Sequence, residues 1–265
     1  MTAGRGNLED VLYEVDDGLA WITINRPERF NSFRGRTIDE LIRCFKAAWA
    51  DRSVGVVAIT GAGDKAFCAG GDLKDRDGMT DAQWQHQHAV FEQAVTTMMD
   101  VPPPIIGAIN GVAYGGGTEF VLLCDFAYGA THARFALTEV TLGIMPGAGA
   151  TQMLPRAVGL RRAKEFLLCG APCSAQEALE WGILNKVCEP DKLMDEALAT
   201  ARKIAANAPI SIRQAKKSLN MAAQTDFRNG YVFEIEAYNR MVPTEDRMEG
   251  IRAFNEKRKP VYKGQ

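Results

Sequence analysis

Two glycine-rich stretches could bring backbone N–H groups close to a ligand. They are FCAGGDL (67–73) and NGVAYGGGTE (110–119), and each follows an apolar run that predicts a strand. Neither fits the G-x-G-x-x-G pattern of dinucleotide sites, and no G-K-[ST] of a P-loop follows. The glycines of one loop alone are adequately explained by tight strand–helix packing. Two such loops at the carboxyl ends of strands favour a site in which two N–H groups converge on one oxygen, an oxyanion hole.

Two glutamates follow these features along the chain. Glu119 comes directly after the glycine run, and Glu139 lies in FALTEVTLGIMPGAG after another strand-like run. Each has a simpler explanation, since Glu119 could stabilise a helix dipole and Glu139 could be an ordinary loop carboxylate. If a turn brings them together at an apolar site, they would shift each other's pKa values and divide acid and base roles.

The other candidate catalytic side chains do not form a motif. His86 and His88 are two residues apart on a polar segment and are expected to face solvent, and His132 is expected in a turn. There is no G-x-S-x-G elbow and no H-E-x-x-H motif, so we predict no metal site. The remaining chemistry is proton transfer beside a stabilised oxyanion.

The elements expected to position these residues predict an α/β fold. Strands are expected at 11–15, 19–25, 54–60, 104–110 and 124–130, and helices at about 37–50, at 84–100 and after Gly117. The polar stretch 71–84 is predicted to be a loop. After residue 149 only 182–188 looks strand-like, and helices are expected at 190–207, 209–225, 228–241 and 244–258. We therefore predict a core at 1–190 and a helical region at 191–265.

Composition narrows the function classes. A net charge of −2 offers no basic surface for nucleic acid or anionic membranes. No apolar run is long enough to predict a membrane span, and the stretch 1–20 is too polar for a signal peptide. The six cysteines form no metal-binding spacing, which favours reduced, buried thiols in a cytoplasmic protein.

Several motifs in order resemble those of the crotonase, or enoyl-CoA hydratase/isomerase, superfamily. They are INRPERFNSF (24–33), AFCAGGDL (66–73), NGVAYGGGTE (110–119), CDFAYG (124–129) and residues 135–159, and the resemblance runs to RMEGIRAFNEKRKP (247–260). It implies a spiral of ββα units, a helical C-terminal trimerisation region, a homotrimer or homohexamer, and an acyl-CoA thioester substrate. Coenzyme A would be part of the substrate, with no further cofactor.

The same resemblance assigns roles to individual residues. Gly71 and Gly116 would supply the two oxyanion-hole N–H groups. Glu119 would orient and deprotonate a water, and Glu139 would deliver a proton to the α-carbon. The neighbouring loop residues expected to contact the substrate are Ala69, Gly70, Asp72 and Gly115.

Having both glutamates favours an enoyl-CoA hydratase, because isomerases of the family commonly keep only the carboxylate at position 139. The N-terminal part of the chain, especially NRPERFNSFRGRT, looks closer to naphthoyl-CoA synthase and the ring-cleaving ketoacyl-CoA hydrolases, which suggests a bulky or cyclic acyl group. An isomerase, a ring-cleaving hydrolase or hydratase, and a noncatalytic acyl-CoA- or RNA-binding member remain alternatives.

Overall fold

A six-stranded sheet forms the centre of the computed structural model, which describes residues 8–265. Its order is β1-β2-β3-β5-β7-β10, and every pair is parallel except β1 with β2. The strands are β1 (Val11–Asp16), β2 (Leu19–Ile24), β3 (Val56–Gly61), β5 (Ile105–Ile109), β7 (Phe126–Ala130) and β10 (Lys186–Cys188). A parallel sheet must be covered on both faces, and β3 and β5 are accordingly buried at every position.

A smaller, four-stranded sheet carries the site. Its order is β4-β6-β8-β9, made of β4 (Ala66–Cys68), β6 (Val112–Tyr114), β8 (Arg134–Ala136) and β9 (Cys173–Ser174). The pairs β3/β4, β5/β6 and β7/β8 each place one strand in the large sheet and the next in the small sheet, and helical structure follows each pair. This repetition is the expected spiral of ββα units, so the predicted α/β fold is confirmed.

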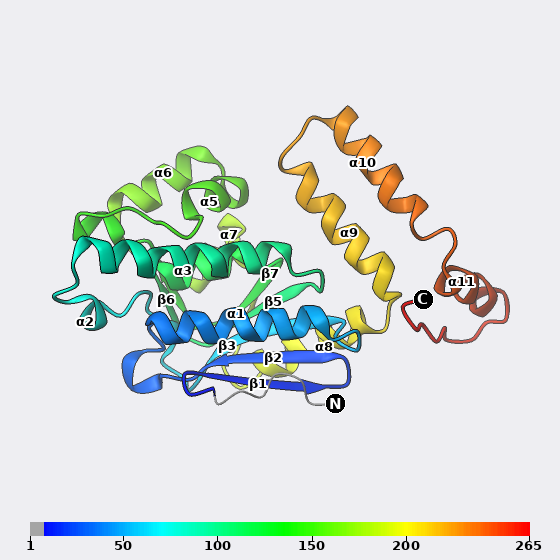
Figure 1. Cartoon of the computed structure of the whole chain (residues 1–265), viewed down its shortest axis with the longest axis horizontal. Coiled ribbons are helices and arrows are strands. Elements are labelled where there is room, and N and C mark those ends of the chain that lie inside the picture. The colour runs from blue at the N-terminus through cyan, green and yellow to red at the C-terminus, as the bar shows by residue number, and fades with distance from the viewer. Residues whose placement is uncertain (1–7) are drawn as a thin grey trace.

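Helices cover both faces of the large sheet (Figure 1). In α1 (Gly35–Ala50) the buried residues Ile38, Leu41, Ile42 and Phe45 recur at helical spacing and join one core cluster with both sheets. On the other face, α8 (Leu193–Ala205) packs through Leu193, Ala197 and Ala201. The remaining helices of the main body are η1 (Pro27–Arg29), α2 (Leu73–Arg76), α3 (Asp81–Asp100), α4 (Gly116–Leu123), η2 (Glu139–Leu142), α5 (Ala150–Val158), α6 (Leu160–Cys169) and α7 (Ala175–Trp181).

The last three helices, which we call the C-terminal arm, lie to one side of the main body (Figure 1). They are α9 (Pro209–Ala222), α10 (Phe227–Asn239) and α11 (Glu245–Asn255). Within α9, Lys216 forms a 2.8 Å ion pair with Asp125 and donates to the carbonyl of Pro103. No residue of α9 is buried, so the arm leaves much of its surface uncovered.

The predicted elements are largely confirmed, with clear exceptions. The short strands of the small sheet and helices α5 to α7 were not predicted. The stretch 71–84 is not simply a loop, because it contains α2 and the first turn of α3. Cys169 is exposed whereas the other five thiols are buried, and all six are free, so the prediction of buried thiols is wrong for Cys169.

Two further expectations concern the chain's N-terminus and the membrane. Residues 1–7 of the stretch considered for a signal peptide lie outside the described residues. Over residues 8–265, no helix has the length and apolarity needed to cross a bilayer. α8 falls in the helical region predicted at 191–265 and packs on the large sheet, and the division at residue 190 stays a prediction.

The start of α4 is pressed against the end of β4. A Cβ atom on Gly117 would lie 2.0 Å from the carbonyl oxygen of Cys68, so only glycine permits this approach. The contact fixes the distance between the two glycine loops. Because Glu119 follows closely in the same helix, the contact also sets the position of that carboxylate.

We expect Gly117→Ala to lower the free energy of unfolding by about 3 kcal/mol, since the added methyl group forces α4 away from β4. Gly35→Ala is the matched control, because a Cβ there meets nothing within 4 Å. Urea denaturation measures both changes. Equal stability of the two variants would contradict this packing argument.

Candidate functional site

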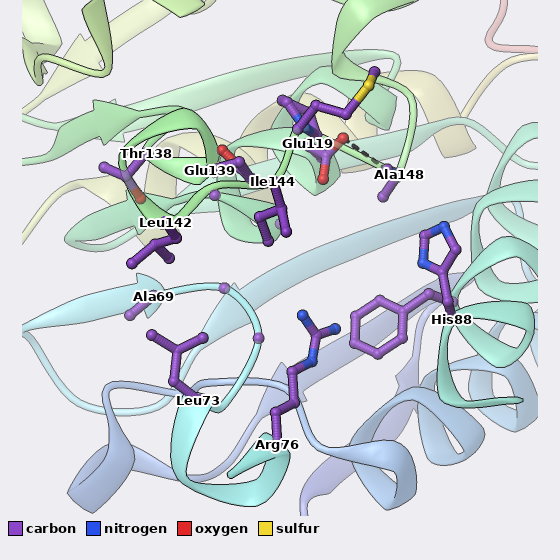
Figure 2. A pocket seen from close by; sticks show the side chains of 18 of the residues that line it. Ala69, Leu73, Arg76, His88, Glu119, Thr138, Glu139, Leu142, Ile144 and Ala148 are labelled. Atoms are coloured by element: carbon purple, nitrogen blue, oxygen red, sulfur yellow. Dashed lines mark hydrogen bonds between the residues drawn. The ribbon is translucent and has the colours of Figure 1, made fainter. Parts of the chain in front are cut away.

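A cavity of about 590 Å³ opens where the two glycine loops meet (Figure 2). Its lining includes most of the site residues predicted from the sequence: Ala69, Gly70, Gly71, Gly115, Gly116, Glu119 and Glu139. The loops come from the ends of neighbouring parallel strands, β4 and β6, and therefore lie side by side. Two segments that are distant along the chain thus form one site.

In the first loop, the N–H of Gly71 is left without a hydrogen-bond acceptor among the described residues. Phe33 forms an isolated parallel bridge with Gly71, donating to the carbonyl of Gly70 at 2.8 Å and accepting from the N–H of Asp72 at 2.8 Å. In such a bridge the middle residue turns its own N–H away from its partner. Within residues 8–265 the Gly71 N–H has no backbone or side-chain acceptor.

In the second loop, the N–H of Gly116 is left without a hydrogen-bond acceptor among the described residues. Gly115 donates to the carbonyl of Ala136 at 2.8 Å, and Gly116 begins α4, where first-turn N–H groups have no partner within the helix. Gly70 has a φ of +90°, and a Cβ on it would lie 3.2 Å from the nitrogen of Gly116. The two loops are therefore in contact, and both free N–H groups belong to residues of the same cavity wall.

Glu119 lies in the first turn of α4 and is 3% exposed. Its Oε1 accepts hydrogen bonds from the N–H groups of Ala148 (2.7 Å) and Ala150 (3.0 Å). Figure 2 shows the other carboxyl oxygen directed into the cavity. Burial raises the pKa of Glu119 to about 7, and the charge of Glu139 acts in the same direction.

Glu139 is the first residue of η2 and is 8% exposed. A Cβ on Gly115 would lie 3.0 Å from its Oε1, which places the carboxyl directly against the second glycine loop. Its Oε2 is buried and has no hydrogen-bond partner among the described residues. Burial raises the pKa of Glu139, and an oxygen without donors adds to the preference for the protonated acid.

Asp72 is placed differently from the other predicted residues, since it is absent from the cavity lining. Its carboxylate accepts from Arg26 at 3.0 Å and from the N–H of Lys74 at 3.1 Å, where it caps α2. Burial opposes the charge, yet the hydrogen bond and charge of Arg26 hold the pKa of Asp72 below its usual range. The carboxylate of Asp72 therefore supports the first loop, and its contact with the substrate stays a prediction.

Further side chains from the segment 73–100 line the cavity, and the sequence did not indicate them as site residues. Arg76, Trp84, His88 and Phe91 line it. His86 is exposed as expected. His88 is half-exposed but also lines the cavity, where a Cβ on Gly147 would lie 2.6 Å from its ring, so the expectation of exposure holds for it only in part. Over the described part of the chain, no group of three or more His, Cys, Asp or Glu could hold a metal ion.

Comparison with known proteins supports one family. The family model described as "Enoyl-CoA hydratase/isomerase" matches residues 14–265. The chain is 36% identical over 252 residues to a short-chain-enoyl-CoA hydratase of Clostridium acetobutylicum, covering 95% of this chain and 97% of that protein. It is 37% identical to an (E)-benzylidenesuccinyl-CoA hydratase of Thauera aromatica, covering 96% and 99%. A crystal structure of an enoyl-CoA hydratase from Bacillus anthracis is 41% identical with a TM-score of 0.95, covering 97% of this chain and 100% of that chain.

The raised pKa of Glu119 predicts a pH-dependent stability. Its folded-state pKa of about 7 exceeds the unfolded value of 4.5, so the folded protein binds more protons between these values. The free energy of unfolding therefore falls as the pH rises from 4.5 through 7. We expect Glu119→Gln to remove up to about 3 kcal/mol of this fall. Thermal unfolding across this interval, with the exposed Glu165→Gln as control, measures the difference. The same pH slope in parent and Glu119→Gln would contradict the assignment.

Proposed function

Because the chain belongs to the enoyl-CoA hydratase/isomerase family, we propose that it adds water across the 2,3-double bond of an acyl-CoA thioester. The observation that carries this proposal is that two buried glutamates and two free backbone N–H groups line one cavity. Hydration of a conjugated thioester needs both parts. One part handles the protons, and the other stabilises the charge that appears on the thioester oxygen.

In this proposal the thioester oxygen accepts hydrogen bonds from the N–H groups of Gly71 and Gly116. When the water oxygen bonds to C3, the π electrons move towards the thioester and negative charge develops on its oxygen as an enolate. Fixed N–H dipoles, one of them at the first turn of α4, stabilise that charge without reorganising. The reaction requires no cofactor other than the coenzyme A of the substrate itself.

The hydrogen bonds of the two carboxyl groups support different roles. Glu119 accepts from two backbone N–H groups, which favour its carboxylate form, whereas the buried Oε2 of Glu139 accepts from none among the described residues. Glu119 is therefore the base that takes a proton from the water, and Glu139 the acid that gives a proton to C2. The proton gained by Glu119 then returns to Glu139, so the enzyme leaves the cycle unchanged.

We further propose a homotrimer or homohexamer in the cytoplasm. The C-terminal arm supports the oligomer, because it exposes large apolar side chains that a separate chain would leave in water. They are Leu219, Phe227, Tyr231, Val232, Tyr238, Ile251 and Phe254, with Phe227 88% and Phe254 84% exposed. The six free thiols support a reducing compartment.

We expect Glu119→Gln and Glu139→Gln each to lower kcat for hydration of crotonyl-CoA by between about 10²- and 10⁴-fold, because each removes a group that moves a proton. Binding of a saturated acyl-CoA should change little. The loss of conjugated enoyl absorbance measures hydration, and calorimetry measures binding. Near-parental hydration by either variant would exclude the two-glutamate mechanism.

A panel of linear and cyclic enoyl-CoA thioesters separates the alternatives. Hydration of at least one linear member is expected. A protein that moves the double bond or opens a ring, but never adds water, would be an isomerase or a ring-cleaving enzyme instead.

The oligomer is tested by light scattering after size-exclusion chromatography. We expect a mass three or six times 29.0 kDa, and a smaller mass for Phe254→Glu, which places a charge on the apolar surface of the arm. A parent protein that elutes with the mass of one chain would contradict the proposal.

A further inference from the structure

Arg76 brings a positive charge into an otherwise apolar part of the cavity. It ends α2, and Figure 2 shows its guanidinium projecting into the space across from Glu119 and Glu139. The guanidinium carbon lies 4.5 Å from the centre of the Trp84 ring and 5.4 Å from that of Phe91. The rings hold the group in a defined place and shield it from water.

Arg76 uses only its Nε in hydrogen bonds to the described residues, which leaves its two Nη groups free. Its Nε donates to Oε1 of Gln87 at 2.8 Å, and Nε2 of Gln87 donates to Asp75 at 3.0 Å. This chain of contacts anchors one side of the guanidinium. Within residues 8–265 it forms no ion pair with a carboxylate, and Nη1 and Nη2 have no acceptor. A partly buried guanidinium with free donors in fork geometry matches a carboxylate, which accepts two parallel hydrogen bonds.

The free Nη groups lie close to the proposed binding place of the thioester oxygen. A Cβ on Gly71 would lie 3.2 Å from Nη1 and 3.3 Å from Nη2. The guanidinium is therefore next to the residue whose N–H is proposed to bind the thioester oxygen. An acyl chain held there needs only a few carbon–carbon bonds, each about 1.5 Å long, to bring its far end to Arg76.

We propose that Arg76 binds a second carboxylate at the end of the acyl chain, so that the preferred substrates are short enoyl-CoA thioesters that carry a terminal carboxylate. This inference rests on the proposed function and specifies its substrate class. A purely apolar chain gains nothing from a desolvated guanidinium at this position, and an all-apolar wall would bind it better. A carboxylate chain near Glu119 and Glu139 needs such a cation, because those two groups would otherwise repel it.

Two other roles for Arg76 make different predictions. If the guanidinium stabilised the enolate oxygen, its loss would slow neutral and anionic substrates equally. If it only held α2 against α3 through Gln87 and Trp84, its loss would lower stability and affect both substrates alike. Only recognition of the carboxylate predicts that loss of Arg76 slows the anionic substrate more than the neutral one.

The test compares (E)-glutaconyl-CoA with (E)-pent-2-enoyl-CoA, which have the same five acyl carbons and differ in a terminal carboxylate or methyl group. We expect the parent to prefer glutaconyl-CoA in kcat/KM. Arg76→Met should lower kcat/KM for glutaconyl-CoA by roughly 100-fold, mainly through KM, and change that for pentenoyl-CoA by less than about threefold. Arg76→Lys should retain part of the preference.

The matched control is Arg162→Met, which removes another guanidinium stacked on a tryptophan, at 4.8 Å from Trp181 and outside this cavity. It should leave both substrates unchanged. Equal losses on the two substrates in Arg76→Met, or a parent without preference for the carboxylate, would overturn the inference.

Binding of the saturated analogues glutaryl-CoA and pentanoyl-CoA, followed by calorimetry, gives a readout that does not require turnover. If the parent hydrates no member of the enoyl-CoA panel, including these two substrates, the proposed function fails. Arg76→Met must still weaken glutaryl-CoA binding alone for the inference to stand, and equal binding of glutaryl-CoA by parent and variant would refute it.

Discussion

The close approach of β4 to the first turn of α4 is the contact on which the site depends. Gly117 lies against the carbonyl of Cys68, and Gly70 lies against the nitrogen of Gly116. Backbones can come this close only where side chains are absent. As a result, two strand ends that are distant along the chain place Gly71 and Gly116 in the lining of one cavity, each with an N–H that has no acceptor among the described residues.

The same contact determines where charge is placed. α4 presents Gly116 at its first residue and Glu119 within its first turn, so one helix supplies both an N–H and a carboxylate. The N–H groups of Ala148 and Ala150 stabilise Glu119, whereas Glu139 has a buried oxygen that no described residue satisfies. Burial raises the pKa of both carboxyl groups, so it lowers stability as the pH rises towards neutral. In return, the pKa of Glu119, at about 7, allows this group to exchange a proton near neutral pH.

The sequence predicted the long strands and most of the residues that meet in one cavity, because both follow strong local rules. An apolar run such as VGVVAIT, or the glycine run before Glu119, can be recognised from a few consecutive residues. The small sheet was missed because β4, β6, β8 and β9 are too short to show a period of two. Arg76 was missed because GDLKDRDGMTDAQW reads as a polar loop, although it folds as α2 and the start of α3. The place of His88 in the cavity lining was missed because its neighbours in sequence are polar. The ion pair of Asp72 with Arg26 was not predicted, because a loop carboxylate gives no sign in sequence that a distant arginine will bind it.

In the proposed mechanism Glu119 and Glu139 act together on one water and one thioester. The kcat of the double variant Glu119→Gln/Glu139→Gln, measured beside the two single variants, distinguishes joint from independent action. Groups that act as a unit are strongly non-additive, so the double variant should be within about tenfold of the slower single variant. Losses that multiply across the two sites would show instead that the two carboxyls work independently.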